Sequence, residues 1–225
     1  MLAILGGVFK TADLRRKLLF TLAMIVLYRV GTFIPAPGVS YGNVQQCLNA
    51  NVTSGGVYDI VNLFSGGALL QLSIFALGVM PYITASIIIQ LLRVVIPRFQ
   101  ELHDEGAQGQ AKLTQYTRYL TIALALLNAT TIVSMARSGV LLGNCPGIIP
   151  QDDVLHILLI IVTLCAGTTV IMWMGEQITE RGVGNGMSLL IFTSIASSFP
   201  SALGSIQRTH GWGIFAAVCG IGLLV

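Results

Sequence analysis

The feature that most constrains this chain is a series of long apolar segments without charge. Residues 68–92, 119–136 and 182–207 contain no Asp, Glu, Lys or Arg. A bilayer core about 30 Å thick is crossed by a helix of roughly 20 mostly apolar residues. Backbone polar groups in lipid must hydrogen-bond within the protein, so only helices or a closed barrel can span it. Because the apolar runs are continuous rather than alternating, the sequence predicts an all-α membrane protein.

Composition supports the same conclusion. Hydrophobic residues make up 54% of the 225 positions and charged residues only 9%, whereas soluble domains average about 25% charged residues. Lipid is therefore the main solvent of this chain.

The apolar runs and the polar or turn-rich segments between them divide the chain into spans and loops. We expect a cytoplasmic amphipathic segment (1–17), span 1 (18–34), an external loop (35–57), a short segment that does not span (58–67), span 2 (68–96), a cytoplasmic loop (97–118), span 3 (119–135), an external loop (136–153), span 4 (154–174), a cytoplasmic loop (175–186), span 5 (187–203), an external hinge loop (204–211) and a truncated span 6 (212–225). We expect the chain to end inside that sixth span.

Residues 58–67 are too short to cross a bilayer, since Ser65, Gly66 and Gly67 separate seven moderately apolar residues from the following run. This segment can lie on the surface or dip partway into the membrane, where only surrounding protein or a water-filled cavity tolerates it. Span 2 follows as one long run with Pro81 near its middle.

The basic residues indicate which loops face the cytoplasm. Lys and Arg near span ends favour the inside. With a cytoplasmic N-terminus, Arg137 and Arg208 lie outside and Arg29 lies in span 1. The inside then holds the other nine of the twelve: Lys10, Arg15, Arg16, Lys17, Arg93, Arg98, Lys112, Arg118 and Arg181.

Cysteines and polar motifs point to no catalytic or metal chemistry. Cys47 and Cys145 both fall in predicted external loops, so a disulfide and two free thiols both remain open. The glycine-rich residues 182–186 follow no strand and precede no Lys-Ser/Thr pair, which favours a flexible loop over a phosphate site. No HExxH or GxSxG motif occurs, so we expect neither an enzyme nor a cofactor nor a metal site.

The predicted spans offer only mild polarity. No Asp, Glu or Lys lies in the middle of a span, which argues against a transporter coupled to ions. The polar residues that do occur suit helix packing and a gently polar seam: Gln71, Thr84, Ser86, Gln90, Asn128 and Thr131.

Four sequence blocks in order carry a resemblance to a known family. They are residues 28–39 (YRVGTFIPAPGV), residues 64–70 with 73–90 (FSGGALL and SIFALGVMPYITASIIIQ), residues 113–119 (LTQYTRY) and residues 173–188 (WMGEQITERGVGNGMS). Together they resemble the N-terminal half of bacterial members of the SecY family, the channel subunits of the Sec protein translocase. In that family two inverted repeats of five helices form an hourglass, an architecture with a working site near the midplane. The resemblance implies that this chain supplies the first repeat, with its short plug helix, and the start of the second.

The resemblance also implies roles for particular residues. An apolar pore ring would consist of Val79 and Ile83 on span 2 and Met187 and Ile191 on span 5, each pair spaced i, i+4 on one helix face. Thr84 and Asn128 would lie near the lateral gate, although Asn128 can equally bond within its own bundle. The plug, which would fill the outer funnel at rest, would consist of Tyr58, Asp59, Ile60, Val61, Asn62, Leu63, Phe64, Ser65, Gly66 and Gly67.

Partners and location follow from the resemblance too. The family is associated with a small clamp subunit, a second small subunit, a motor ATPase or ribosome on the cytoplasmic face, presecretory polypeptides and membrane lipids, with no direct binding of nucleic acid. We expect a multi-pass protein of the plasma (inner) membrane. The leading hypothesis is a passive protein-conducting channel. A secondary transporter with a midplane site and a non-conducting scaffold are the alternatives.

Overall fold

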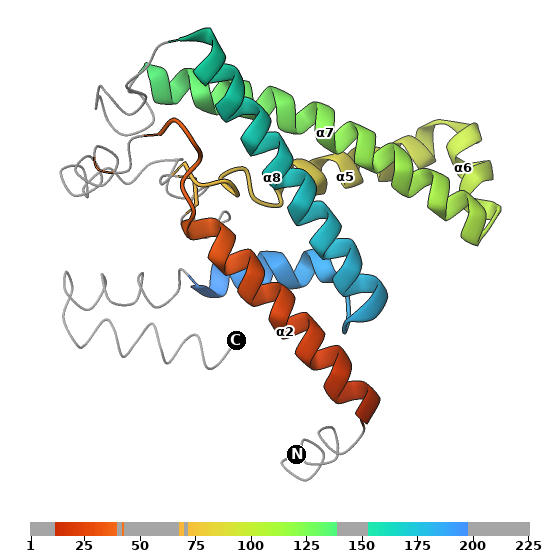
Figure 1. The fold of residues 1–225 in the computed structure, drawn as a ribbon. Helices are drawn as coiled ribbons and strands as arrows, with labels where there is room; N and C mark the ends of the chain where they lie inside the picture. Colours follow the sequence, from red (N-terminus) through yellow and green to blue (C-terminus); the bar gives the residue numbers. More distant parts are fainter. Residues whose placement is uncertain (1–11, 40–41, 43–67, 70–71, 139–152, 198–225) are drawn as a thin grey trace, which may run out of the picture.

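The computed structural model describes residues 12–39, 42, 68–69, 72–138 and 153–197 (Figure 1). Its helices are α2 (Ala12–Phe33), α5 (Met80–Val95), α6 (Pro97–Asp104), α7 (Ala107–Arg137) and α8 (Val154–Arg181), followed by the unlabelled helix Gly186–Ser197. Over these residues the only extended pairing is an isolated bridge between Pro35 and Ser73. The predicted all-α fold class is confirmed.

Helix α8 lies at the centre of the arrangement. It packs against α7 on one side and α2 on the other, and α5 and α6 pack against α7. Figure 1 shows α2 on the side of α8 away from α6 and the far end of α7, and the blue helix Gly186–Ser197 beside the end of α8 that precedes it. Within the described ranges, Gln108–Arg137 and Val154–Arg181 are long and apolar enough to cross a membrane, and Met80–Val95 with Pro97–Asp104 would be a third span only if that bent pair counts as one.

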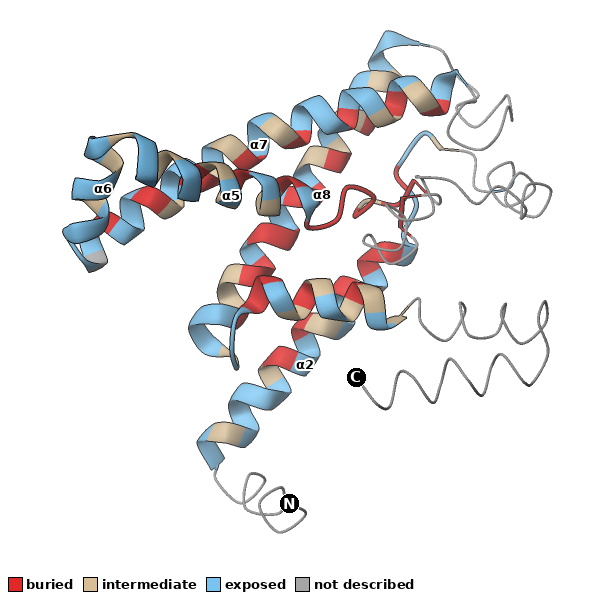
Figure 2. Cartoon of the chain, turned by 180° about the vertical axis from the view of Figure 1, so that it is seen from behind, coloured by how far each residue is buried: buried red, intermediate tan, exposed pale blue. Residues whose placement is uncertain are grey.

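Helix α7 meets α8 through a stripe of small side chains. Ala125, Ala129 and Val133, spaced four residues apart, are at most 2% exposed and share a core cluster with Ile160 and Leu164 of α8. Small residues at this spacing let two helix backbones approach closely, which is how helices associate where no hydrophobic effect drives them. The outward faces of the same helices remain exposed, as the pale blue surfaces in Figure 2 show.

The prediction of one continuous second span over residues 68–96 is wrong in its first half. Residues 72–79 form consecutive turns rather than a helix, and α5 begins only at Met80. Two residues explain the break. Gly78 has φ +57°, a left-handed conformation that glycine adopts most readily. Pro81 stands in the first turn of α5 rather than near the middle of a span, where its missing N–H costs nothing and its ring prevents the helix from extending further back.

The non-helical segment 72–79 is held by backbone hydrogen bonds to the residues that follow α2. Ala36 N donates to Leu72 O at 2.9 Å, and Ile74 N donates to Ile34 O at 2.9 Å. Ala76 and Gly78 N–H groups are satisfied within the segment. Irregular backbone within a membrane is tolerated only when protein supplies its hydrogen-bond partners, and here residues just after α2 supply two of them.

Segment 72–79 also joins the two halves of the core. Leu72, Ala76 and Leu77 belong to the cluster with α7 and α8. Phe75 and Val79 belong to a second cluster, which contains side chains of α2, α8 and helix Gly186–Ser197. Side chains of one short segment therefore contribute to two separate core clusters.

The predicted cytoplasmic loop 97–118 is helical. Helix α6 covers its first part at 101° to α5, and the first turns of α7 cover the rest. The rings of Phe99 and Tyr116 lie 5.7 Å apart and hold α6 against α7. Pro97 at the start of α6 accounts for the bend, since the residue before a proline is excluded from the helical region.

Other helix bounds differ from the predicted spans mainly because helices continue past the apolar run. Helix α2 begins six residues before residue 18, α7 extends on both sides of 119–135, and α8 continues from 174 to Arg181. The predicted plug, truncated sixth span, hinge loop 204–211, Cys47 and Cys145 lie outside the described residues. The sidedness of the loops stays a prediction.

Gly167 offers a test of how tightly segment 72–79 is seated on α8. A Cβ at Gly167 would collide with the backbone carbonyl oxygen of Ile74, which cannot rotate away. We expect Gly167→Ala to lower the unfolding free energy by about 1–3 kcal/mol through overpacking, measured as a lower thermal midpoint of the purified protein in detergent. Gly42→Ala is the matched control because no atom of the described residues lies within 4 Å of a Cβ there. Equal midpoints for the two variants would contradict this account of the packing.

Candidate functional site

The four aliphatic residues predicted to form a ring come together in the structure. Val79 and Met187 are 2% and 8% exposed in one core cluster, and Ile83 and Ile191 pack against it half-buried. Val79 precedes α5, and its carbonyl oxygen accepts from Ile83 N at 3.1 Å, so the i, i+4 relation of this pair survives the break in the span. Residues more than one hundred positions apart therefore share one apolar contact.

A groove of about 250 Å³ opens beside this contact, between α5 and helix Gly186–Ser197. Its apolar lining includes Ile83, Met187 and Ile191, and the side chains with polar groups are Tyr82, Ser86, Gln90, Asn185 and Ser188. The polar side chains offer neutral donors and acceptors only. Across the described part of the chain, no three His, Cys, Asp or Glu side chains gather as a metal site. The groove can therefore contact a chain or solvent, and its lining offers no charged group.

The corner between α8 and helix Gly186–Ser197 positions Met187. Asn185 Oδ1 accepts from the backbone N–H groups of Met187 at 3.1 Å and Ser188 at 3.3 Å, which is an N-cap of the new helix. Thr179 Oγ1 donates to Gly175 O and accepts from Gly186 N, both at 2.9 Å. Residues 182–185 form a non-helical turn, as expected, and side chains satisfy several of its backbone groups; its flexibility stays a prediction.

Glycines make that corner close. A Cβ at Gly175 would collide with the Met187 side chain, and one at Gly186 would collide with the Gly175 carbonyl. Thr21 Oγ1 of α2 accepts from Val183 N at 3.3 Å and ties the turn to α2. Gly175 and Gly186, which both belong to the sequence block 173–188, thus allow α8 and helix Gly186–Ser197 to approach closely.

Thr84 and Asn128, the predicted lateral-gate residues, also lie together. Both line a groove of about 260 Å³ between α5 and α7, with Met80, Thr131 and Ile132 among its other walls. Thr84 Oγ1 donates to Met80 O of its own helix at 3.1 Å. Within the described ranges the Asn128 amide has no hydrogen-bond partner and is exposed, which favours the seam over a bond inside its own bundle.

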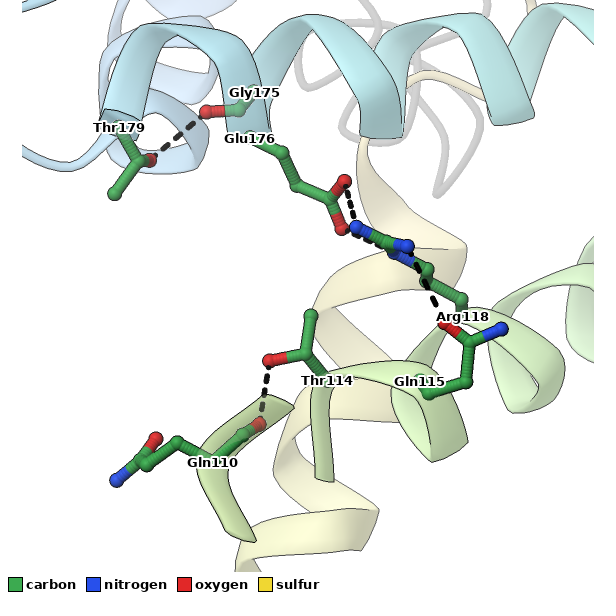
Figure 3. Close-up of polar contacts among 7 residues, drawn as sticks. All are labelled: Gln110, Thr114, Gln115, Arg118, Gly175, Glu176 and Thr179. Carbon is green, nitrogen blue, oxygen red and sulfur yellow. Dashed lines mark hydrogen bonds and ion pairs between the residues drawn. The ribbon is translucent and has the colours of Figure 1, made fainter. Parts of the chain in front are cut away.

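An ion pair that the sequence analysis did not anticipate joins α7 to α8 (Figure 3). Arg118 Nε donates to Glu176 Oε1 at 2.9 Å, and Arg118 Nη2 donates to Glu176 Oε2 at 2.7 Å. The Glu176 side chain is 15% exposed and that of Arg118 40%. Gln115 Oε1 accepts from Arg118 Nη1 at 3.3 Å. Two parallel charge-assisted bonds fix distance and orientation together, which a single contact cannot do.

The sequence predicts loops at Arg118 and Glu176 because the apolar runs end beside both residues. In the structure α7 and α8 continue past the ends of those runs and include both residues. The signal that could have found the pair is that Arg118 and Glu176 stand inside two of the four family-like blocks, 113–119 and 173–188. Similarly, Gly78 and Pro81 could have located the break in span 2. The predicted plug, Tyr58 to Gly67, lies outside the described residues.

A family model described as SecY matches residues 73–225, more than half of the chain. The chain belongs to the SecY family. Similar relatives are the protein translocase subunits SecY of Micrococcus luteus, 60% identical, and of Streptomyces scabiei, 56% identical, each aligned over 100% of this chain. The chain spans about half the length of these curated relatives, 51% and 53% respectively.

Solved structures support the SecY fold. A structure described as a protein-conducting channel and Sec61 in the canine ribosome-channel complex from the endoplasmic reticulum each give a TM-score of 0.56 at 18% identity, covering 91% of this chain and 40% of theirs. At this identity the likeness concerns the fold alone. The SecY-family chain is therefore a membrane protein of helical architecture, as its composition predicted.

The Arg118–Glu176 pair provides a test of what holds α7 against α8. We expect Glu176→Gln and Arg118→Lys each to lower the unfolding free energy by about 1–2 kcal/mol, since both remove the fork-to-carboxylate geometry and only the first removes charge. Thermal unfolding in detergent measures the effect. Lys112→Gln is the control, because its pair with Glu105 is 3.3 Å long with side chains 59% and 50% exposed and such pairs contribute about 0–1 kcal/mol. If Arg118→Lys unfolded at the same thermal midpoint as the parent protein, the paired hydrogen bonds of the Arg118 guanidinium would contribute nothing to stability.

Proposed function

We propose that this chain forms the first half of a protein-conducting channel, which moves unfolded presecretory polypeptides across the membrane and releases membrane-protein spans sideways into lipid. The observation that carries the proposal is the meeting of Val79 and Ile83 with Met187 and Ile191 beside an uncharged groove. Family membership supports the same function, because the relatives are named protein translocase subunits.

The proposed constriction works through the absence of directional bonds. A ring of aliphatic side chains holds off water and ions by dewetting. The same side chains yield around a passing polypeptide of any sequence, because they form no hydrogen bond that a particular substrate must match. The polar lining by Ser86, Gln90, Asn185 and Ser188 would give an extended chain neutral contacts on its way to the ring.

The proposed lateral gate is the groove that Thr84 and Asn128 line. An exposed amide without a partner among the described residues suits a seam that closes on the second repeat and parts from it at low cost. In membrane proteins a hydrogen bond between helices contributes on average about 0.6 kcal/mol. Modest contacts of this kind would let an apolar segment of the substrate exchange into lipid.

The other parts of the proposal concern location and partners. We place the protein in the plasma membrane with its N-terminus in the cytoplasm, because basic residues concentrate in the loops that this orientation puts inside. Two small Sec subunits, and a motor ATPase or ribosome, would bind the assembled channel, and the motor or ribosome would supply the energy. The solved Sec61 relative comes from a ribosome-channel complex. Neither a catalytic reaction nor a cofactor is part of the proposed function.

The channel is preferred over the secondary transporter. The relatives reported above are named protein translocase subunits, and the groove that the described residues form has no charged side chain to bind a coupling ion. The ion pair Arg118–Glu176 lies between α7 and α8 and does not line this groove.

The constriction can be tested by making it polar. In the full-length channel in planar bilayers, we expect the double substitution Ile83→Ser with Ile191→Ser to raise resting ion conductance at least tenfold, because hydroxyls at both positions allow water to enter. Leu91→Ser is the control, since Leu91 is 61% exposed on α5 and outside the groove. Unchanged conductance in the double variant would overturn the proposed constriction.

The proposed plug has its own test. Deletion of residues 58–67 from the full-length channel is expected to raise resting conductance while presecretory substrates still cross proteoliposome membranes, since the aliphatic ring remains. Conductance identical to that of the parent channel would count against a plug in this segment.

A further inference from the structure

Tyr28 of α2 contacts both polypeptide segments that carry the aliphatic residues. It is fully buried, at 0% exposure, in the cluster that contains Val79 and Met187. Its ring stacks on Phe75 with centroids 5.9 Å apart and 10° between planes. Its hydroxyl lies 2.7 Å from Ser194 Oγ, across 166 residues of sequence. One side chain therefore bridges segment 72–79 and helix Gly186–Ser197.

The direction of that hydrogen bond follows from the other bond of Ser194. Ser194 Oγ donates its single proton to Leu190 O at 2.9 Å. The oxygen of Ser194 must then accept, so the Tyr28 hydroxyl is the donor. Loss of the Tyr28 hydroxyl removes this contact and leaves the bond from Ser194 to Leu190 intact, which makes Tyr28→Phe a clean change.

Both contacts lie close to the proposed ring. Phe75 precedes Val79 by four residues in the same short segment, and Ser194 follows Ile191 by one helical turn on the same face. Gly31, one turn after Tyr28, leaves the space that the Phe75 ring occupies, because a Cβ there would collide with that ring. The end of α2 is thus shaped to receive Phe75 beside Tyr28.

We propose that Tyr28 is a positioning residue, which sets the separation of the two segments that bear Val79, Ile83, Met187 and Ile191 and so keeps the constriction closed at rest. The proposal rests on the proposed channel function. Tyr28 itself has no exposed surface among the described residues. It acts through Phe75 on one side and Ser194 on the other.

Resting conductance of the full-length channel in planar bilayers tests the proposal. We expect Tyr28→Phe to raise the resting open probability about two- to tenfold, the range that corresponds to loss of one neutral hydrogen bond. Ser194→Ala should have a similar or larger effect, and the double variant should not exceed the larger single effect, because both changes break the same bond. Tyr119→Phe is the matched control, since Tyr119 is 62% exposed on α7.

A distance readout separates positioning from general destabilisation. In a full-length background with every native cysteine replaced by serine, the pair Ile83→Cys with Ile191→Cys reports the approach of the two segments through its rate of disulfide formation. We expect Tyr28→Phe to slow that rate at least twofold at a temperature where the channel remains folded, and Tyr119→Phe to leave it unchanged.

The outcomes distinguish the two proposals. If Ile83→Ser with Ile191→Ser raises conductance but Tyr28→Phe changes neither conductance nor cross-linking, the role of Tyr28 is overturned and the channel stands. If the serine pair leaves conductance unchanged while Tyr28→Phe slows cross-linking, the constriction is overturned and Tyr28 still positions the segments. Additive effects in the Tyr28→Phe, Ser194→Ala double variant would refute the shared hydrogen bond.

Discussion

The arrangement depends on one constraint: the backbone of residues 72–79 is buried without being helical, so other parts of the protein must satisfy it. The residues just after α2 provide the partners, through the bonds Ala36 N to Leu72 O and Ile74 N to Ile34 O. Because these bonds fix the segment against the end of α2, its side chains enter both core clusters at once. The start of α5, and with it Val79 and Ile83, is placed by this attachment.

Two kinds of contact hold the other helices together: close packing at small residues, and hydrogen bonds that side chains form. Small residues bring α7 onto α8, and Gly167 lets segment 72–79 cross α8 at backbone distance. Where orientation matters as well as contact, hydrogen bonds take over: the Arg118–Glu176 fork between α7 and α8, the Asn185 cap before Met187, and the Tyr28–Ser194 bond between α2 and the last described helix. Apolar packing in lipid has little directional preference, so these few polar contacts determine how the helices are rotated.

The candidate site shows the same two kinds of contact, apolar packing and hydrogen bonding. Its proposed working surface is aliphatic and yielding, whereas the groups that position it, such as Asn185 and Tyr28, act through hydrogen bonds. A channel for chemically varied polypeptides needs that separation, because a polar group at the constriction would favour particular substrates and admit water. Thr84 and Asn128 provide milder polarity on a different groove, where the proposed seam must both close and part.

The sequence alone determined the helical class, the membrane environment and the family, because uncharged apolar runs have few possible folds in lipid and four ordered blocks are specific. Through those blocks the resemblance also singled out residues that line each groove: Ile83, Met187 and Ile191 in one, and Thr84 and Asn128 in the other. Only the tertiary structure decided where the second span breaks, that α6 and the early turns of α7 replace a loop, and that Arg118 meets Glu176 and Tyr28 meets Ser194. Hydropathy records the preference of each residue for lipid or water, whereas these features arise from hydrogen bonds and close approaches between segments far apart in the chain.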